Sequence, residues 1–287
     1  MNFLKGLRAT LRILLNARIT FTKPQHKKIV IFDKELSDFV TKYLDKKNVS
    51  ILDIRFTSNK GEDLNLYILL KMLLSFKFSS SDYFKIYLNI VKPKLLLTLI
   101  DNTTTFWKLK SFYPKAKTMI IQNAFRGMVK FDVLANIETY KKNKNYMCDY
   151  ILTYNKVVGD KYKSFLKGEV VPIGSFRSNS VKINNESKIY DLLLVSMFKK
   201  NHSGYQEMLG NFIKLFNNIK KYSKEKNYKL NILGSKTTEI EEEKAFYKDI
   251  FSNLEFNFIP QAKNRKTYEI VDKAKILISI DSSLGYE

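Results

Sequence analysis

Apolar and polar positions alternate with two different periods along the first part of the chain. Short, almost continuous apolar runs are typical of strands buried on both faces, and apolar residues that recur every three or four positions are typical of helices. The predicted strands are Ile29–Phe32, Val49–Ile54, Leu95–Ile100, Met119–Ile121, Tyr150–Thr153 and Val170–Ile173. Between most of them lie predicted helices, including Leu36–Leu44, Asp63–Phe78, Asp82–Val91 and Lys156–Leu166. This alternation predicts a parallel sheet with helices on both faces.

The pattern stops at the polar stretch Arg177–Lys188 and then starts again. The later predicted strands are Asp191–Val195, Leu230–Leu233, Phe256–Ile259 and Ile276–Ile280, and the predicted helices are Tyr205–Tyr222, Ile240–Phe251 and Thr267–Lys273. A stretch so poor in apolar residues is typical of a linker between domains. The predicted fold class is therefore α/β, with two doubly wound Rossmann-like domains at residues 19–176 and 189–287, joined by a linker at 177–188. Their strand ends are expected to share one cleft.

Residues 1–18 have a different character. Leucine and phenylalanine recur at helical spacing, lysine and arginine lie between them, and the segment contains no acid. We expect a basic amphipathic helix that either packs on the protein or lies on an anionic membrane surface. The longest apolar stretch, Leu64–Leu74, is about half of the roughly 20 residues that cross a bilayer.

Composition narrows the classes of function. A single cysteine, Cys148, excludes an internal disulfide and any site with several cysteine ligands, and two histidines leave little material for a zinc centre. The formal net charge of +22 suits a partner that carries phosphate groups, whether nucleotide, anionic lipid or nucleic acid, although a lysine-coated surface needs no ligand to be soluble.

Polar residues follow several predicted strands, where the carboxyl ends of parallel strands form ligand sites. In the first domain these candidates are Asp33, Asp101, Asn102, Asn123 and Arg126. An arginine in a turn after a strand, such as Arg126, can bind a carboxylate or phosphate with two hydrogen bonds, and a surface ion pair is the alternative. Arg177 lies at the expected hinge. In the second domain Gly234 and Ser235 end a strand. For Asp33 and Asp101 the alternative is a turn carboxylate with no catalytic role.

The last residues run from an apolar strand into the turn Asp281–Glu287. Serines in such a turn can cap a following helix and leave backbone N–H groups free for an anion. The helix that the turn would open is not in the sequence, so we expect the second domain to be incomplete.

Three segments resemble the GT-B glycosyltransferases, and most closely the bacterial surface carbohydrate biosynthesis proteins: Asp281–Glu287, Ile121–Gly127 and Val171–Arg177. The resemblance covers about residues 29–287. It implies a nucleotide-sugar donor held mainly by the second domain, with Ser282, Ser283 and Gly285 at the phosphates and Glu287 at the ribose hydroxyls.

Transfer of a sugar from a nucleotide needs cations or N–H donors at the departing phosphate. Lys199 and His202, which follow a strand of the second domain, are candidates for this role, and a surface residue is the alternative for His202. A base for the acceptor hydroxyl would come from Asp33 or Asp101. We therefore expect neither a metal nor a cofactor.

The favoured hypothesis is a glycosyltransferase that acts on a surface polysaccharide or lipid-linked saccharide, in the cytoplasm or peripherally on the inner face of the cell membrane. A polyol-phosphate transferase of surface polymer synthesis is the alternative enzyme. A basic nucleic-acid-binding module is less favoured, because the basic residues are spread along the whole chain and the aromatic residues occupy core positions. An inactive scaffold is the remaining alternative.

Overall fold

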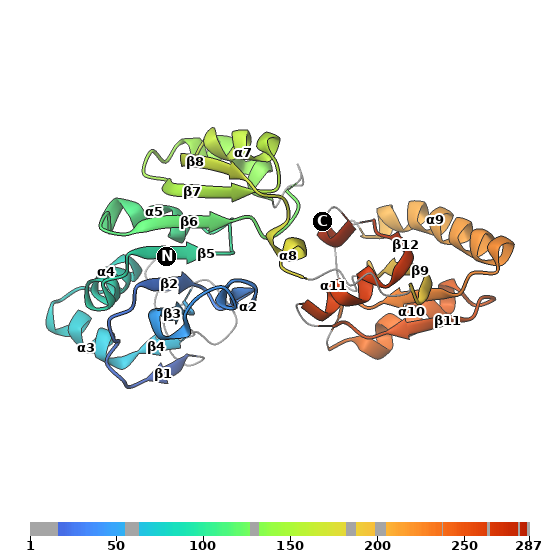
Figure 1. Cartoon of the computed structure of the whole chain (residues 1–287), viewed down its shortest axis with the longest axis horizontal. Coiled ribbons are helices and arrows are strands. Elements are labelled where there is room, and N and C mark those ends of the chain that lie inside the picture. Colours follow the sequence, from blue (N-terminus) through green and yellow to red (C-terminus); the bar gives the residue numbers. More distant parts are fainter. Residues whose placement is uncertain are drawn as a thin grey trace, which may run out of the picture. The chain divides into compact units, whose positions relative to one another are not determined.

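The computed structural model describes residues 17–54, 63–126, 132–181, 188–198, 205–236, 238–262, 265–280 and 282–285. It divides into two compact units, Met1–Phe176 and Arg177–Glu287 (Figure 1). The boundary falls where the predicted linker begins, and the first residues of that linker continue a short helix, α8 (Phe176–Asn179). The helix expected at residues 1–18 lies outside the described residues, except that Arg18 begins strand β1 (Arg18–Thr20).

The first unit contains, among its described residues, a six-stranded sheet whose strands are all parallel. In spatial order the strands are β3 (Val49–Leu52), β2 (Ile29–Phe32), β5 (Leu95–Thr98), β6 (Lys117–Ile121), β7 (Met147–Thr153) and β8 (Lys167–Pro172). Val30 and Ile31 are both fully buried, although successive side chains of a strand point to opposite faces. The sheet is therefore covered on both sides, as its apolar runs predict.

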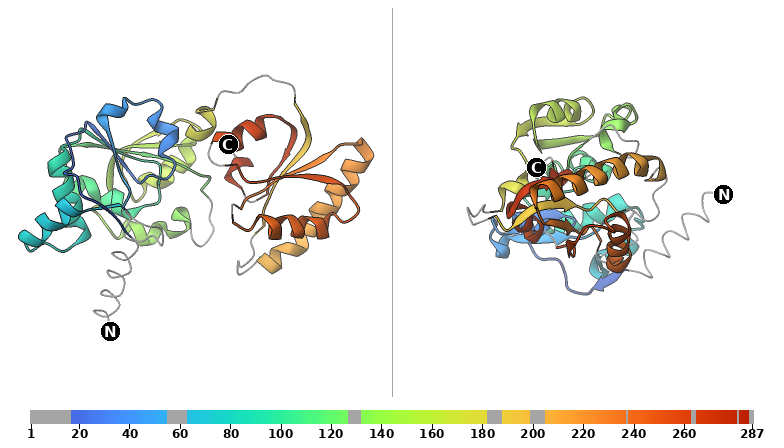
Figure 2. Two further views of the ribbon diagram at one scale, coloured as in Figure 1. Left: turned by 90° about the horizontal axis from the view of Figure 1, so that it is seen from below. Right: turned by 90° about the vertical axis from the view of Figure 1, so that its right-hand side faces the viewer.

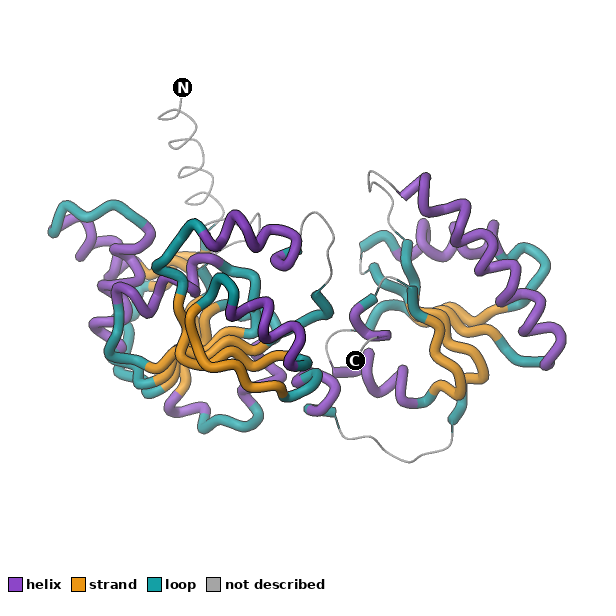
Figure 3. Tube along the Cα trace, turned by 90° about the horizontal axis from the view of Figure 1, so that it is seen from above, coloured by secondary structure: helices purple, strands orange, loops and turns teal. Residues whose placement is uncertain are grey.

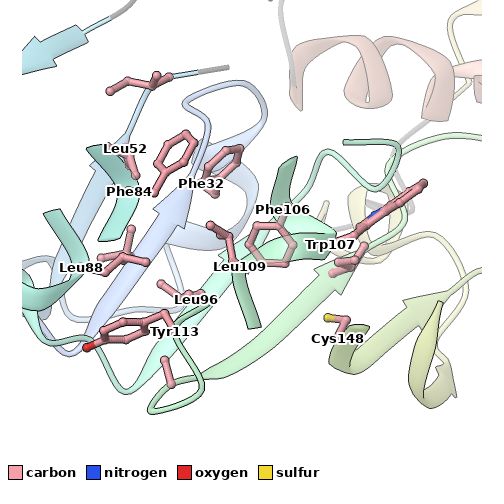
Figure 4. Close-up of a cluster of buried hydrophobic side chains, with 14 of the residues drawn as sticks. Phe32, Leu52, Phe84, Leu88, Leu96, Phe106, Trp107, Leu109, Tyr113 and Cys148 are labelled. Atoms are coloured by element: carbon pink, nitrogen blue, oxygen red, sulfur yellow. The ribbon is translucent and has the colours of Figure 1, made fainter. Parts of the chain in front are cut away.

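Amphipathic helices supply that cover. They are α2 (Ser37–Thr41), α3 (Leu66–Leu74), α4 (Ser80–Val91), α5 (Thr104–Phe112), α6 (Ile137–Lys141) and α7 (Lys156–Lys163), with 3-10 turns at Lys46–Asn48 and Val133–Asn136. Figure 4 shows part of the main core, in which Phe32 of β2 lies between Phe84 of α4 and Phe106 of α5. Phe32, Phe84 and Phe106 thus occupy core positions of this unit.

One predicted helix is partly wrong. Residues Asp63–Asn65, expected to start the helix Asp63–Phe78, form strand β4, which pairs in parallel with β1 in a separate two-stranded sheet. The Asn65 side chain sets the start of the helix, because its Oδ1 accepts a hydrogen bond from the backbone N–H of Ile68 at 3.2 Å. Asn65 is therefore the N-cap of α3, and an N-cap residue is extended rather than helical.

The second unit has a four-stranded parallel sheet within its described part, in the order β11 (Phe256–Ile259), β10 (Leu230–Leu233), β9 (Tyr190–Val195) and β12 (Ala274–Ile278). Helices α9 (Tyr205–Lys226) and α10 (Ile240–Ile250) pack on one face, and α11 (Arg265–Asp272) packs on the other (Figures 2 and 3). Each unit is thus a doubly wound α/β structure, as predicted.

No described helix is long and apolar enough to span a membrane.

Candidate functional site

The chain order of the strands reverses direction at one place in each sheet. In the first unit the chain runs outward from β2 to β3 on one side, and from β5 through β6 and β7 to β8 on the other. A doubly wound sheet opens a ligand crevice at the carboxyl ends of the two strands that flank such a reversal. Here those strands are β2 and β5, and the hydroxyl of Thr98 joins them by donating to the carbonyl oxygen of Phe32 at 3.0 Å.

Asp33 directly follows β2 at this reversal. It is 3% exposed, and its Oδ1 accepts a hydrogen bond from the backbone N–H of Glu35 at 2.8 Å. Its φ of 79° lies in the left-handed region, which residues other than glycine adopt rarely. Strained backbone conformations of this kind are concentrated at functional sites. Asp33 is therefore a carboxylate held in one fixed orientation at the edge of the sheet.

Asp101 follows β5 and is paired with Arg126, which follows β6. The two side chains form a forked ion pair, in which Nε of Arg126 donates to Oδ2 of Asp101 at 2.8 Å and Nη2 donates to Oδ1. Nη2 also donates to Oδ1 of Asn123 at 2.8 Å, and Nη1 lies 3.5 Å from Oδ1 of Asp132. The carboxylate that Arg126 grips in two places therefore belongs to the same chain.

Tyr162 of α7 completes this buried cluster by donating to Oδ2 of Asp101 at 2.5 Å. Burial raises the pKa of the Tyr162 phenol well above its usual value, and the neighbouring Asp101 carboxylate raises it further. Burial disfavours the charged form of Arg126, but Asp101 outweighs this effect and the pKa of the guanidinium lies above its ordinary value. The cluster holds the ends of β5 and β6 and helix α7 together.

The geometry favours a positioning role for Asp101 over the catalytic role expected from the sequence. Its side chain is 1% exposed, and both carboxylate oxygens already accept hydrogen bonds from Arg126. A general base must instead have an oxygen within reach of the acceptor hydroxyl. The adjacent Asn102 is exposed, and Asn123 is partly buried. These two side chains are the better candidates for contact with a ligand.

In the second unit the reversal lies between β9 and β12. The two strands are parallel neighbours, with Leu192 beside Ile276 and Leu194 beside Ile278. Their carboxyl ends therefore open on the same edge. Ser196 follows β9, and residues 279–285 follow β12.

The turn after β12 is compact. Ser282 Oγ accepts a hydrogen bond from the backbone N–H of Leu284 at 3.3 Å, and a 3-10 turn covers Ser283–Gly285. A Cβ atom at Gly285 would lie 2.5 Å from Cβ of Ser279, so a side chain at this position would force the turn away from the end of β12. Glycine is required here by close packing, independently of any bound phosphate.

A buried glutamate on α10 ties the ends of β9 and β10 together. Glu243 is fully buried, and the hydroxyl of Ser196 donates to its Oε1. The backbone N–H and the hydroxyl of Ser235 donate to the same oxygen at 2.8 and 2.9 Å, and the N–H of Lys236 donates to Oε2 at 3.2 Å. These four hydrogen bonds provide partners for both oxygens of the buried carboxylate.

Tyr247, one helical turn after Glu243, extends this network. Its hydroxyl donates to Oγ of Ser196 at 3.1 Å and accepts from the backbone N–H of Met197 at 3.0 Å. Gly234, a predicted donor-binding residue, lies beside the glutamate, since a Cβ there would be 3.1 Å from its Oε2. The structure thus places Gly234 and Ser235 on a rigid loop of the edge that also carries the turn after β12.

Four residues of the expected second-domain site lie outside the described residues: Lys199, His202, Asp281 and Glu287. Arg177, at the start of the second unit, lies over the ring of Tyr268 at 5.8 Å from its centroid, in the geometry of a cation–π contact. The part of the chain that the structure describes contains no group of three or more residues able to hold a metal ion.

Sequence reasoning missed Glu243 and Tyr162, although both leave a signal. Glu243 shares a helix face with Tyr247 and Phe251, and it is the one carboxylate of Glu241–Glu243 on that apolar face. Tyr162 shares its face with Val158 and Phe165, and a buried tyrosine hydroxyl needs a partner. A polar group at a core position of a predicted helix marks a buried network.

Comparison with solved structures defines the class of fold. The chain is similar to UDP-GlcNAc 2-epimerase from Neisseria meningitidis bound to UDP-GlcNAc, with a TM-score of 0.50, 13% identity, and coverage of 89% of this chain and 78% of that one. It is also similar to MnaA from S. aureus in a co-structure with UDP, with a TM-score of 0.52, 15% identity, and coverage of 91% and 75%. These similarities, with the two doubly wound units, establish a GT-B-like fold.

The family follows from the sequence. Residues 119–287, more than half of the chain, match the family model described as "putative O-antigen biosynthesis protein". The chain belongs to this family, and its role lies in the biosynthesis of surface carbohydrate. A search of curated proteins found no match.

Proposed function

We propose that this chain is a glycosyltransferase that moves a sugar from a nucleotide-activated donor to a surface polysaccharide or lipid-linked saccharide. The observation that carries the proposal is the parallel pairing of β9 with β12, which puts the loop after Val195 and the turn after Ile278 on one edge. Two loops on the edge of one reversal point are suited to a diphosphate. Membership of a surface carbohydrate family supports a saccharide acceptor.

The donor binds in the second unit. Ser282, Ser283 and Gly285 hold the phosphates, and Glu287 accepts hydrogen bonds from the ribose hydroxyls. Lys199 and His202, which follow β9 in the sequence, stabilise the departing nucleotide by their charge and hydrogen-bond donors, so the reaction needs no metal. The buried Glu243 keeps the neighbouring loops in the arrangement that binds the donor.

The first unit supplies the base for the acceptor hydroxyl. We assign this role to Asp33, which lies at the reversal between β2 and β5 and is oriented by the backbone N–H of Glu35. Asp101 holds Arg126 and is a positioning residue. Asn102 and Asn123 contact the acceptor.

Donor binding is tested by a thermal-shift screen with UDP, GDP, CDP, dTDP and ADP. One of them should raise the melting temperature in a concentration-dependent manner, because a ligand that binds the native state stabilises it. Glu287→Ala should weaken binding of that nucleotide by about 1–3 kcal/mol, and Ser283→Ala should have a smaller effect. Glu241→Ala, at an exposed position of α10, is the control. Unchanged affinity in a folded Glu287→Ala variant would remove this turn from the site.

The reaction is tested with the sugar form of the nucleotide that binds. Transfer to a membrane-derived saccharide should be lost in Asp33→Asn while nucleotide affinity stays unchanged, and a chelator should leave transfer intact. The solved structures named above include a 2-epimerase, so the assay also follows the sugar itself. Epimerisation of the donor without an acceptor would contradict the transferase assignment, but the assignment of the nucleotide site would stand.

A further inference from the structure

Helix α3 and the turn after it present an exposed apolar surface in the first unit. Its members are Leu70, Leu73, Leu74, Phe76 and Phe78, with exposures between 50% and 86%; we call this set the apolar turn. Ile68 and Met72, on the other side of the helix, are buried in the core. Helix α3 thus carries apolar side chains on its buried side and on its exposed side, and the folded unit covers only the first of these. Figure 1 shows α3 and α4 at the periphery of this unit.

The backbone holds the most exposed of these side chains in an unfavourable conformation. Phe76 has a φ of 51°, in the left-handed region, and ends α3 in a Schellman motif. In that motif the N–H of Phe76 donates to the carbonyl of Leu73 at 3.1 Å, and the N–H of Lys77 donates to the carbonyl of Met72 at 2.9 Å. Glycine is the usual residue at this position, because it has no Cβ. A phenylalanine here, 86% exposed, is disfavoured by the fold.

The positive charge around the apolar turn indicates which kind of partner this surface binds. Lys71 and Lys77 are exposed within it, and the sequence contains no acid from Leu64 to Ser81. Asp82, the first acid that follows, is bound to Ser79 in the capping box of α4. A second copy of the chain carries the same lysines and a net charge of +22, so contact between two copies would bring like charges together. Exposed leucine and phenylalanine side chains among lysines match an anionic lipid bilayer instead.

We propose that the apolar turn inserts into the headgroup region of an anionic membrane and holds the first unit on that surface. The leucine and phenylalanine side chains enter the boundary of the acyl chains, and Lys71 and Lys77 pair with lipid phosphates. This surface is distinct from residues 1–18, and the inference does not depend on which nucleotide or saccharide the protein uses.

Vesicle flotation tests the proposal with the full chain and phosphatidylcholine vesicles, with and without phosphatidylglycerol. Phe76→Gly should lower binding to the anionic vesicles about tenfold. The same variant should have a melting temperature equal to or above that of the original chain, because glycine suits the left-handed position. Val157→Ser, at a 67% exposed position of α7, is the matched control and should bind like the original chain.

A charge variant distinguishes the contribution of the lysines to membrane binding from that of the apolar side chains. Replacing Lys71 and Lys77 by Glu should lower binding to the anionic vesicles at least about tenfold and leave binding to neutral ones unchanged. Replacing the exposed Lys163 and Lys214 by Glu keeps the net charge of that variant and should have a smaller effect. Each pair is also introduced beside Arg8→Glu and Arg12→Glu, so that a contribution of residues 1–18 is measured separately.

Three outcomes would overturn the proposal. Equal flotation of Phe76→Gly and the original chain would show that the apolar turn does not enter the bilayer. A dimer that dissociates in Phe76→Gly, seen by light scattering, would identify a second copy as the partner. A loss of stability in Phe76→Gly would show that the side chain serves the fold.

Discussion

Tyr162 donates its hydroxyl hydrogen to Oδ2 of Asp101 at 2.5 Å, and the two residues lie 61 positions apart in the sequence. Asp101 follows β5, Tyr162 lies on α7, and Arg126, after β6, completes the contact. A single carboxylate therefore joins the loops after β5 and β6 to helix α7. Because Asp101 is fully buried, the contribution of this cluster to the stability of the fold depends on complete pairing of the carboxylate.

Asp101→Asn should be strongly destabilising, because it leaves the buried guanidinium of Arg126 without a counter-charge. We expect a loss of about 3–5 kcal/mol in the free energy of unfolding, measured by urea denaturation. Tyr162→Phe removes one hydrogen bond and should cost about 1–2 kcal/mol. Tyr43→Phe, at a 58% exposed position, is the control. A stable Asp101→Asn variant that lacks activity would restore the catalytic role expected from the sequence.

Glu243→Gln should disturb the donor site through the loops that the glutamate holds. The amide keeps the size of the side chain but places N–H donors where Ser235 and Lys236 already donate, so the unfolding free energy should fall by about 1–3 kcal/mol. Nucleotide affinity should fall as well. Glu241→Gln, exposed on the same helix, is the matched control. If affinity stays intact in a folded Glu243→Gln variant, the network serves stability alone.

Replacement of glycine by alanine should weaken nucleotide binding at one position and raise the stability of the fold at another. Gly285→Ala brings a Cβ to within 2.5 Å of Cβ of Ser279, so it should shift the turn after β12 and weaken nucleotide binding. Gly210→Ala lies in α9, where an added Cβ meets nothing within 4 Å, so it should raise stability by roughly 0.5–1 kcal/mol. Thermal unfolding with and without nucleotide measures both. Equal nucleotide affinity in the two variants would contradict the role of this turn.

The thiol of Cys148 should be unreactive in the native protein. Burial raises its pKa to about 12, and the thiolate is the reactive form. A thiol reagent at pH 8 should label the unfolded chain and not the native one. The raised pKa also means that the buried thiol contributes stability below its ordinary pKa of 9.0, and this contribution is lost as the pH rises toward 12. Cys148→Ser should therefore unfold with a weaker dependence on alkaline pH.

Asp149 predicts the opposite dependence on pH. Burial opposes its charge, but Lys110, the backbone N–H of Thr118 and Lys117 donate to the carboxylate and hold its pKa well below the ordinary value of 3.8. Its contribution to stability is complete above that value and is lost as the pH falls through the native pKa. Asp149→Asn should cost about 1–3 kcal/mol at neutral pH. The difference from the original chain should shrink on acidification; a constant difference from pH 7 to pH 2 would argue against the ion pairs.

Much of the fold could be predicted from the sequence, because parallel strands buried on both faces appear as nearly continuous apolar runs. Ile29–Phe32, Leu230–Leu233 and Phe256–Ile259 have the predicted bounds. The start of α3 could not be predicted, since β4 depends on pairing with the distant β1. Local periodicity carries no information about such a partner.

The candidate site was predictable in part for a similar reason. Polar residues at strand ends can be read from the sequence, and the α/β pattern predicts parallel strands, but the structure is needed to show that β9 and β12 are neighbours. Whether a polar side chain faces a ligand or another side chain depends on contacts between distant segments. Asp101 and Asp33 look alike as strand-end carboxylates in the sequence, which does not show that Asp101 is paired with Arg126 and Tyr162.

The position of β12 in its sheet also bears on how the protein is made. This strand pairs with β9, and the ion pair between Lys275 and Asp191 joins residues 84 positions apart. During synthesis β9, β10 and β11 all leave the ribosome before β12, so the reversal point of the second sheet is assembled last. Until then the edge of β9 stays open, and premature termination or slow translation near Ile276 would leave an exposed strand edge that chaperones must protect.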